Sequence, residues 1–371
     1  PNRHATLDHL IEAQPAESMS LIIRAFNLYF SLVNIAEETS QLHRRRRLVQ
    51  RGKSMWSGSF HDTLMNLKRQ GIEAAELQTL LDRLCYLPVL TAHPSEARRR
   101  TIKGALRNIF LSVEDLDDPR NKGMYREEVV DRLANQIRVL WKTDEVRAFK
   151  LDVRDEIYSG LSYFPQSLFQ AVTQIYRNFH TAVVDVYGED VAARLKAPAF
   201  LRFGSWIGGD RDGHPGVTTE VTALAWRMQA ETAYEEYLRR LERLFDQLSL
   251  SDRLCKPSEP LMASLAEDTR VATQLFGGQP NPHPQEPYRR KLEIMLFRIR
   301  RNLDLNRRAM AGSEPLFEEP GYASAQAFLD DLGLIRDSLI GHGDETLARG
   351  ELQDLILLVE KPTRDDVDFR Y

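Results

Sequence analysis

Residues 200–216 read FLRFGSWIGGDRDGHPG, and their order of residue types sets the fold class. They begin as a short apolar run at 200–207 and turn at once into a dense polar loop that opens with two glycines. The stretch LPVLTAHPSEARRRT, residues 87–101, has the same order, with an apolar run at 87–91. Strand, polar loop and helix form the repeating unit of a (β/α)₈ barrel, whose catalytic groups lie on loops after the strands. The sequence predicts two such units, which are too few to close a barrel.

Most of the remaining sequence is predicted to be helical, because apolar residues recur at helical spacing. In residues 21–38 they occupy nearly the whole circumference, which predicts a helix buried on most sides. Further helices are predicted at 72–84, 96–116, 126–147, 167–187, 220–248, 288–309, 324–340 and 351–360.

Three regions follow from this pattern. Residues 1–86 form an N-terminal helical region, and residues 87–276 hold the two strand-loop-helix units with long helical insertions. Residues 277–371 form a further helical region that starts with the Pro-rich segment 277–287, the clearest linker in the chain.

Composition excludes several classes of protein. The 371 residues are 42% hydrophobic and carry a formal charge of −4, so the chain is globular and has no bulk cationic field for nucleic acid. Cys85 and Cys255 stand in unrelated contexts, which argues against a disulfide scaffold or zinc knuckle and favours a reducing cytoplasm. The most apolar stretch, Leu21 to Ala36, contains Arg24 and falls short of the roughly 18 to 20 apolar residues of a membrane span.

A basic cluster at Arg44 to Arg47 allows two interpretations. It could bind an anion or nucleic acid, but the aromatic residues of a stacking platform are missing. We therefore interpret it as a solvated helix end and expect neither a nucleic-acid nor a membrane partner.

The first polar motif centres on His93. A histidine after a strand, held by Pro94 and just upstream of a helix, suits proton transfer near neutral pH. A purely structural role stays open, since Ser95 and Glu96 could simply cap the helix. The arginines at 98–100 could be a solvated face, or could hold phosphate or carboxylate oxygens in their guanidinium forks.

The second polar motif projects Asp210, Arg211 and Asp212 from a strand end after two glycines that allow a tight turn. A calcium loop is the rival interpretation. It fails because the oxygen ligand at loop position five and the bidentate Glu at position twelve are missing. The motif also lacks the Gly-Lys-Ser/Thr ending of a phosphate-binding P-loop.

Together, TAHPSE with its arginines (91–100) and GSWIGGDRDG (204–213) resemble the two N-terminal signatures of the phosphoenolpyruvate carboxylase family, in the right order and at about the right separation. The likeness continues between them through WKTDEVR at 141–147 and covers nearly the whole chain. The resemblance implies a predominantly α-helical chain holding the first two strands of a (β/α)₈ barrel.

The family joins bicarbonate to phosphoenolpyruvate and forms oxaloacetate and phosphate, with Mg²⁺ or Mn²⁺. By resemblance, His93 and Arg211 are catalytic, and Trp206, Asp210 and Asp212 bind substrate. A second set of residues matches an allosteric site for a phosphate-type activator: Arg99, Arg100 and Arg147. The resemblance also implies a homotetramer in the full-length enzyme, with metal ligands outside this chain.

The chain departs from the family pattern at several places. Ser95 stands for the usual Thr, His214 for the usual Asn, and residues 150–153 replace a Lys-Pro-Thr-Pro stretch. Family members are more than twice as long, and the sequence stops near the expected third barrel strand. We therefore expect this chain to be inactive alone. The rival hypothesis is a non-catalytic homologue with a binding or regulatory role, which a degraded motif would have favoured.

Overall fold

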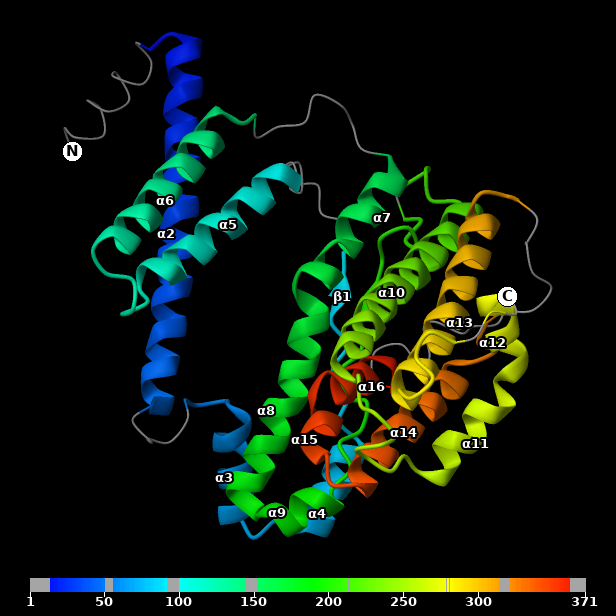
Figure 1. Ribbon diagram of the computed structural model, residues 1–371. Helices are drawn as coiled ribbons and strands as arrows, with labels where there is room; N and C mark the ends of the chain where they lie inside the picture. The colour runs from blue at the N-terminus through cyan, green and yellow to red at the C-terminus, as the bar shows by residue number, and fades with distance from the viewer. Residues whose placement is uncertain are drawn as a thin grey trace. The chain divides into compact units, whose positions relative to one another are not determined.

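The computed structural model describes residues 14–50, 56–91, 100–144, 152–212, 214–277, 279, 281–313 and 321–360, and these are predominantly α-helical (Figure 1). The elements are α2 (Ala16–Gln50), α3 (Phe60–Arg69), α4 (Ala74–Asp82), β1 (Val89–Leu90), α5 (Arg100–Leu116), α6 (Met124–Lys142), α7 (Val153–Leu161), the π-helix η1 (Phe164–Leu168), α8 (Phe169–Tyr187), α9 (Glu189–Arg194), β2 (Gly204–Ser205), α10 (Thr219–Gln247), α11 (Glu259–Glu267), α12 (Thr269–Phe276), α13 (Pro287–Met310), α14 (Ala325–Gly341), α15 (Glu345–Leu347), the π-helix η2 (Ala348–Leu352) and α16 (Gln353–Glu360).

The chain divides into two compact units, Pro1–Thr63 with His93–Lys150, and Leu64–Ala92 with Leu151–Tyr371. The first unit, unit 1, is built on α2, α5 and α6, which pack against one another (Figure 1). Its core centres on Ile35, Ile102, Ile109 and Leu140, all buried, with half-buried neighbours around them. This is a small core for helices of this length.

Helix α2 corrects one prediction. It was expected to be buried on most sides, but among its described residues only Ile35 and Thr39 are buried. The reason is geometric: a straight helix that packs against two neighbours covers one stripe of its surface and leaves the rest in water. By length and mean hydropathy alone, α2 is also the one helix in the described residues that could cross a membrane, although a core helix or a signal sequence passes the same test.

The second unit, unit 2, has a larger core. Helices α10 and α13 run side by side at its centre, and α14, η2 and α16 pack around them (Figure 1). The core includes Tyr237, Leu292, Ile299, Phe328 and Leu355, each with at most 2% of its surface exposed.

The core of unit 2 also encloses an ionic cluster. The Lys291 ammonium is fully buried and lies 2.8 Å from a carboxylate oxygen of Asp268 and 2.6 Å from one of Asp331. The Arg298 guanidinium pairs with both carboxylates, and the Tyr322 hydroxyl donates to Asp331 at 2.7 Å. Two cations facing two anions balance the charge, which is the condition for tolerating charges out of water.

The two predicted strands are confirmed as a parallel pair, though shorter than expected. β1 pairs with β2 in the register Val89 with Gly204 and Leu90 with Ser205. Upstream, a further parallel bridge joins Tyr86 to Leu201. Within the described residues these two strands form the whole sheet, so the closed barrel stays a prediction.

Candidate active site

The parallel register places the ends of β1 and β2 side by side within unit 2. The Trp206 amide donates to the Leu90 carbonyl at 2.8 Å, and the Gly204 amide donates to the Pro88 carbonyl at 3.0 Å. Carboxyl ends of adjacent parallel strands are where barrel folds collect their functional loops. The two polar motifs of the sequence therefore begin at neighbouring points in space.

The loop after β2 is anchored by two buried residues, Ile207 and Gly208. Ile207 packs with Ile157 of α7 and Ala225 of α10 in one apolar cluster. Gly208 has φ +79°, and a side-chain carbon there would lie 2.7 Å from the Ile157 side chain and 3.0 Å from Ala225. Both the left-handed backbone and the lack of space require glycine. The Thr222 hydroxyl donates to the Gly208 carbonyl at 2.9 Å and ties the turn to α10.

The polar residues that follow this anchor face solvent. Trp206 is 56% exposed, and Asp210, Arg211 and Asp212 are exposed as well. The Asp210 amide donates to the Trp206 carbonyl at 2.9 Å, and the Asp212 amide donates to a carboxylate oxygen of Asp210 at 3.0 Å. The loop thus holds an indole, two carboxylates and a guanidinium in one short turn, and the guanidinium of Arg211 is the group there that can pair with an anionic oxygen.

The start of α10 adds charge to this loop. Thr218 caps the helix by accepting from the Val221 amide at 3.4 Å. The Thr218 hydroxyl also lowers the pKa of Glu220 through a hydrogen bond, and the Arg211 guanidinium acts in the same direction. Glu220 is therefore an anion beside Arg211 at neutral pH.

His214 has a partner that the sequence did not reveal. Its Nε2 lies 3.7 Å from a carboxylate oxygen of Glu156, on the first turn of α7. That helix was not predicted, although Asp152 caps it by accepting from the Asp155 amide at 2.7 Å. An aspartate followed three and four residues later by acids is an N-terminal helix signal. Asp152, at a position where the chain departs from the family pattern, thus caps a helix that packs against the loop.

Four other candidate residues cannot be placed in this geometry. His93, Arg99 and Arg147 lie outside the described residues. Arg100 is the first residue of α5, and only its backbone is described. Their assignments therefore rest on the sequence. By contrast, the basic cluster Arg44 to Arg47 is described and exposed near the end of α2, where Arg46 pairs with Glu114 at 2.9 Å.

A metal centre is not evident in the described part of the chain. No group of three or more His, Cys, Asp or Glu side chains there converges on one point. Asp210 and Asp212 supply two carboxylates, and one oxygen of Asp210 is already occupied by the Asp212 amide. A Mg²⁺ or Mn²⁺ ion would need further oxygen ligands.

Comparison with known proteins gives this geometry a context. The family model described as phosphoenolpyruvate carboxylase matches residues 1–361. The chain belongs to the phosphoenolpyruvate carboxylase family. A match over nearly the whole chain agrees with the two sequence signatures and confirms the family expected from them.

Curated members of the phosphoenolpyruvate carboxylase family from three bacteria illustrate the extent of the match. The phosphoenolpyruvate carboxylase of Roseiflexus castenholzii is 34% identical over 348 residues, which cover 92% of this chain and 36% of the relative. That of Chromobacterium violaceum is 34% identical over 352 residues, which cover 95% of this chain and 38% of the relative. That of Aromatoleum aromaticum is 33% identical over 355 residues, which cover 94% of this chain and 37% of the relative. The chain therefore spans little more than a third of the length of these relatives and matches their N-terminal part.

Proposed function

We propose that this chain forms one side of the active site of a phosphoenolpyruvate carboxylase. In the reaction, bicarbonate oxygen attacks the phosphorus of phosphoenolpyruvate, and the phosphorus–oxygen bond to the enol breaks to give carboxyphosphate and the pyruvate enolate. Carboxyphosphate then splits into carbon dioxide and phosphate. The enolate carbon forms a bond with carbon dioxide, and the products are oxaloacetate and phosphate.

The role proposed for His93 is proton transfer as carboxyphosphate breaks down. Carboxyphosphate carries a proton on its carboxyl group that must leave as carbon dioxide forms, and a neutral imidazole can accept it. The proton then leaves with phosphate, so the charge balances over the cycle. Trp206 provides an apolar wall for bicarbonate, and Arg211 stabilises negative charge that moves between the carboxyl and phosphoryl groups.

The parallel register of β1 and β2 is the observation that supports this proposal best. The Trp206 amide donates to the Leu90 carbonyl, and in the sequence His93 follows Leu90 by three residues. Adjacent parallel strands bring their following loops to one edge. The proposal extends this pair to the first two strands of a closed (β/α)₈ barrel, with the helical regions 1–86 and 277–371 flanking it.

A divalent cation would stabilise the enolate oxygen and the transferring phosphoryl group when bound. The described residues do not offer a sufficient ligand set, so we assign its ligands to the part of the family's length that this sequence does not cover. The part played by the described loop is to hold Trp206 and Arg211 in position, and the Arg211 guanidinium supplies the contact with anionic oxygens.

Three further properties are part of the proposal. Arg99, Arg100 and Arg147 form a site for an anionic activator, because guanidinium groups match phosphate oxygens. The full-length enzyme is a homotetramer, as the family resemblance implies. It works in the cytoplasm, which is consistent with two free cysteines at positions 85 and 255.

The test is made in a full-length family protein that carries this sequence as its N-terminal part. His93→Asn should lower the rate of oxaloacetate formation by on the order of 10² to 10⁴, the usual loss for a general acid or base. His180→Asn, a change of the same chemistry at an exposed position of α8, is the matched control and should keep the parent rate. Near-normal carboxylation by the His93 variant would refute the assignment.

A second variant tests the role of the loop residue Arg211 independently of that of His93. Arg211→Lys keeps the charge but loses the forked geometry, so it should lower kcat while leaving the fold measured by circular dichroism unchanged. Unchanged kcat would remove Arg211 from the catalytic residues and leave it as a surface charge.

A further inference from the structure

The loop after β2 meets α7 at both of its ends. At the start, Gly208 lies against Ile157, because a side-chain carbon at Gly208 would come within 2.7 Å of the Ile157 side chain. At the end, Nε2 of His214 lies 3.7 Å from a carboxylate oxygen of Glu156. Glu156 and Ile157 are consecutive residues of α7. One turn of helix therefore holds both ends of the segment that carries Arg211.

The two contacts differ in their chemistry. The first is apolar: Ile157 is 2% exposed and belongs to one cluster with Ile207 and Ala225. The second is polar and partly open to water, since the side chains of His214 and Glu156 are 40% and 26% exposed. Packing fixes the first contact, whereas the second depends on a single pair of side chains.

The imidazole of His214 is oriented by its surroundings. A side-chain carbon at Gly216 would lie 3.4 Å from Cε1 of His214 and 3.1 Å from a methyl group of Val153, so the ring and the start of α7 close over this glycine. Nδ1 of His214 is buried and has no hydrogen-bond partner among the described residues. Nε2 is thus the ring nitrogen that faces a partner. It carries a proton in the imidazolium and in one neutral tautomer, and both forms can direct that N–H toward the Glu156 carboxylate.

The backbone connects His214 to Arg211. The His214 amide donates to the Arg211 carbonyl at 3.3 Å, and the Val217 amide donates to the His214 carbonyl at 3.0 Å. A displacement of His214 would therefore carry the peptide group of Arg211 with it.

The two cations of this region have different acidic neighbours. Within the described residues, His214 is the cation that pairs with Glu156. Arg211 instead acts on Glu220 at the start of α10, where it helps to lower the pKa of that carboxyl. Glu156 therefore influences Arg211 through His214 and the loop backbone.

We propose that His214 and Glu156 are positioning residues for Arg211, an inference that rests on the catalytic role proposed for Arg211. The pair fastens the end of the loop to α7 and so fixes the direction from which the guanidinium meets the carboxyl and phosphoryl oxygens. Positioning of this kind acts on kcat, because a small displacement of a catalytic group weakens interactions that are made in the transition state.

The test measures kcat and KM in a full-length family protein that carries this sequence as its N-terminal part. Glu156→Gln and His214→Gln each remove one partner and should lower kcat about 10-fold, while KM for phosphoenolpyruvate stays within about 2-fold of the parent value. The double variant should be no slower than the slower single variant, because the two side chains act as a unit. All of these proteins should give the same helical circular dichroism.

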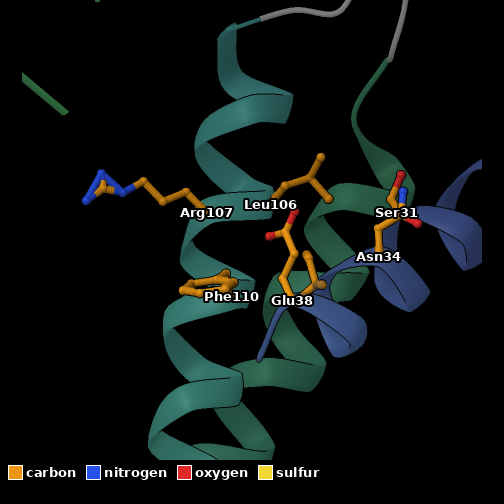
Figure 2. A pocket seen from close by; sticks show the side chains of 7 residues that line it. Ser31, Asn34, Glu38, Leu106, Arg107 and Phe110 are labelled. Carbon is orange, nitrogen blue, oxygen red and sulfur yellow. The ribbon is translucent and has the colours of Figure 1, made fainter. Parts of the chain in front are cut away.

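Two controls make the same chemical change elsewhere, and both should keep the parent kcat. Asp155→Asn removes a carboxylate from the exposed neighbour of Glu156 on α7. Glu38→Gln does so at an exposed position of unit 1. Figure 2 shows Glu38 of α2 beside Leu106 of α5, at the edge of a space of about 400 Å³.

Two further experiments separate positioning from a general structural role. In an Arg211→Ala background no guanidinium is left to position, so Glu156→Gln should lower kcat by less than about 2-fold. Glu156→Lys with His214→Glu exchanges the two charges and should return kcat to within about 3-fold of the parent value. Each of these two substitutions alone places like charges together and should be at least as slow as Glu156→Gln.

Hydrogen exchange follows the loop independently of catalysis. The amides of His214 and Val217 are hydrogen-bonded within the loop, and Glu156→Gln should speed up their exchange about 10-fold. The Asp210 amide donates to the Trp206 carbonyl beside the apolar contact and should keep its rate.

The results distinguish this proposal from the proposed function. If Arg211→Ala lowers kcat while both glutamine variants keep the parent kcat and exchange rates, the positioning role is wrong and the role of Arg211 stands. A further 10-fold loss from Glu156→Gln in the Arg211→Ala background would also overturn it, because the pair would then act through another group. If Arg211→Ala keeps the parent kcat, both proposals fail.

Discussion

Units 1 and 2 are both helical, yet they bury their side chains in different ways. The core of unit 2 extends over α10, α13, α14 and α16 and encloses the ionic cluster of Lys291, Asp268, Asp331 and Arg298. Unit 1 packs α2, α5 and α6 around an apolar cluster with four buried members among the described residues, which also leave one face of α2 uncovered. Helical content alone therefore does not show how much of its apolar surface a unit buries. The apolar surface left over on α2 is available for a further contact.

Breaking the buried charges of unit 2 should cost the most stability. Lys291→Met leaves two carboxylates with one cation of the cluster, Arg298, and the Tyr322 hydroxyl. Removing one partner of a buried pair costs about 3–5 kcal/mol. The free energy of unfolding, measured by urea denaturation with circular dichroism, should fall by that amount.

The matched change in unit 1 should have almost no effect on the free energy of unfolding. Arg132 and Asp115 form an ion pair at 2.5 Å, but both side chains are about half exposed. Exposed pairs contribute about 0–1 kcal/mol, so Arg132→Ala should lower the free energy of unfolding by less than 1 kcal/mol. Equal losses in the two variants would mean that the cluster around Lys291 is open to water.

The second test compares a core residue from each unit. Ile109 and Leu332 are both fully buried, and truncation of either to alanine should cost about 2–5 kcal/mol. Because unit 1 has so few buried residues, Ile109→Ala should increase hydrogen exchange throughout α5 and α6 while α10 and α13 stay protected. Leu332→Ala should loosen α13 and α14 instead. Uniform exchange across both units in either variant would show that they unfold as one body.

The third test concerns the loop that carries the candidate site. Gly208→Ala combines a left-handed backbone with a clash against Ile157, so it should lower the free energy of unfolding by about 2–3 kcal/mol. Gly343 has φ +94° with no atom within 4 Å of an added side chain, and Gly343→Ala should cost only about 1 kcal/mol. If both cost the same, the packing of the loop on α7 has room for a methyl group.

The smallest expected difference between the two units is in how their stability depends on pH. In unit 1, a hydrogen bond from the Arg120 side chain lowers the pKa of Asp118 to about 2. This carboxylate therefore stabilises the fold above its unfolded pKa of about 3.8, and the contribution is lost as the pH falls toward 2. In unit 2, burial raises the pKa of Asp354 above its unfolded value. The stability that this carboxyl contributes is therefore fully present below the unfolded pKa, and it is lost as the pH rises through the pKa of the folded state.

Titration of the two carboxyl carbons by nuclear magnetic resonance measures both shifts directly. Arg120→Ala should return the pKa of Asp118 toward 3.8 and leave that of Asp354 unchanged. Both carboxylates are paired, Asp118 with Arg120 and Asp354 with Arg177, but Asp354 is buried and Asp118 is not. Shifts of the same sign in the parent protein would contradict this difference in burial as the cause.

The sequence predicted the long helices and both strands because these depend on local periodicity. Helices predicted at 220–248 and 288–309 correspond closely to α10 and α13. It missed α3, α7, α9, α11, α12 and α15, which are short and give too few turns for a clear period. The burial of α2 could not be predicted, because an apolar circumference does not say how many neighbours a helix has.

The candidate site was predictable in part. The turn at Gly208 and the exposure of Asp210 to Asp212 follow from paired glycines after an apolar run. The contact between His214 and Glu156 joins residues that lie 58 positions apart in the sequence, and the register of β1 with β2 joins residues 115 positions apart. Such long-range pairings depend on tertiary packing, which a single sequence does not encode in any local pattern.

A coupled assay of oxaloacetate formation with phosphoenolpyruvate, bicarbonate and Mg²⁺ tests whether this chain is one side of a larger active site. It is run side by side on the 371-residue chain, with its intact mass confirmed, and on a full-length family protein that carries this sequence as its N-terminal part. We predict steady turnover by the full-length protein and none above background by the 371 residues, because several metal ligands must converge on one point. Turnover by the shorter chain alone, or a folded but inactive full-length protein, would contradict the proposal.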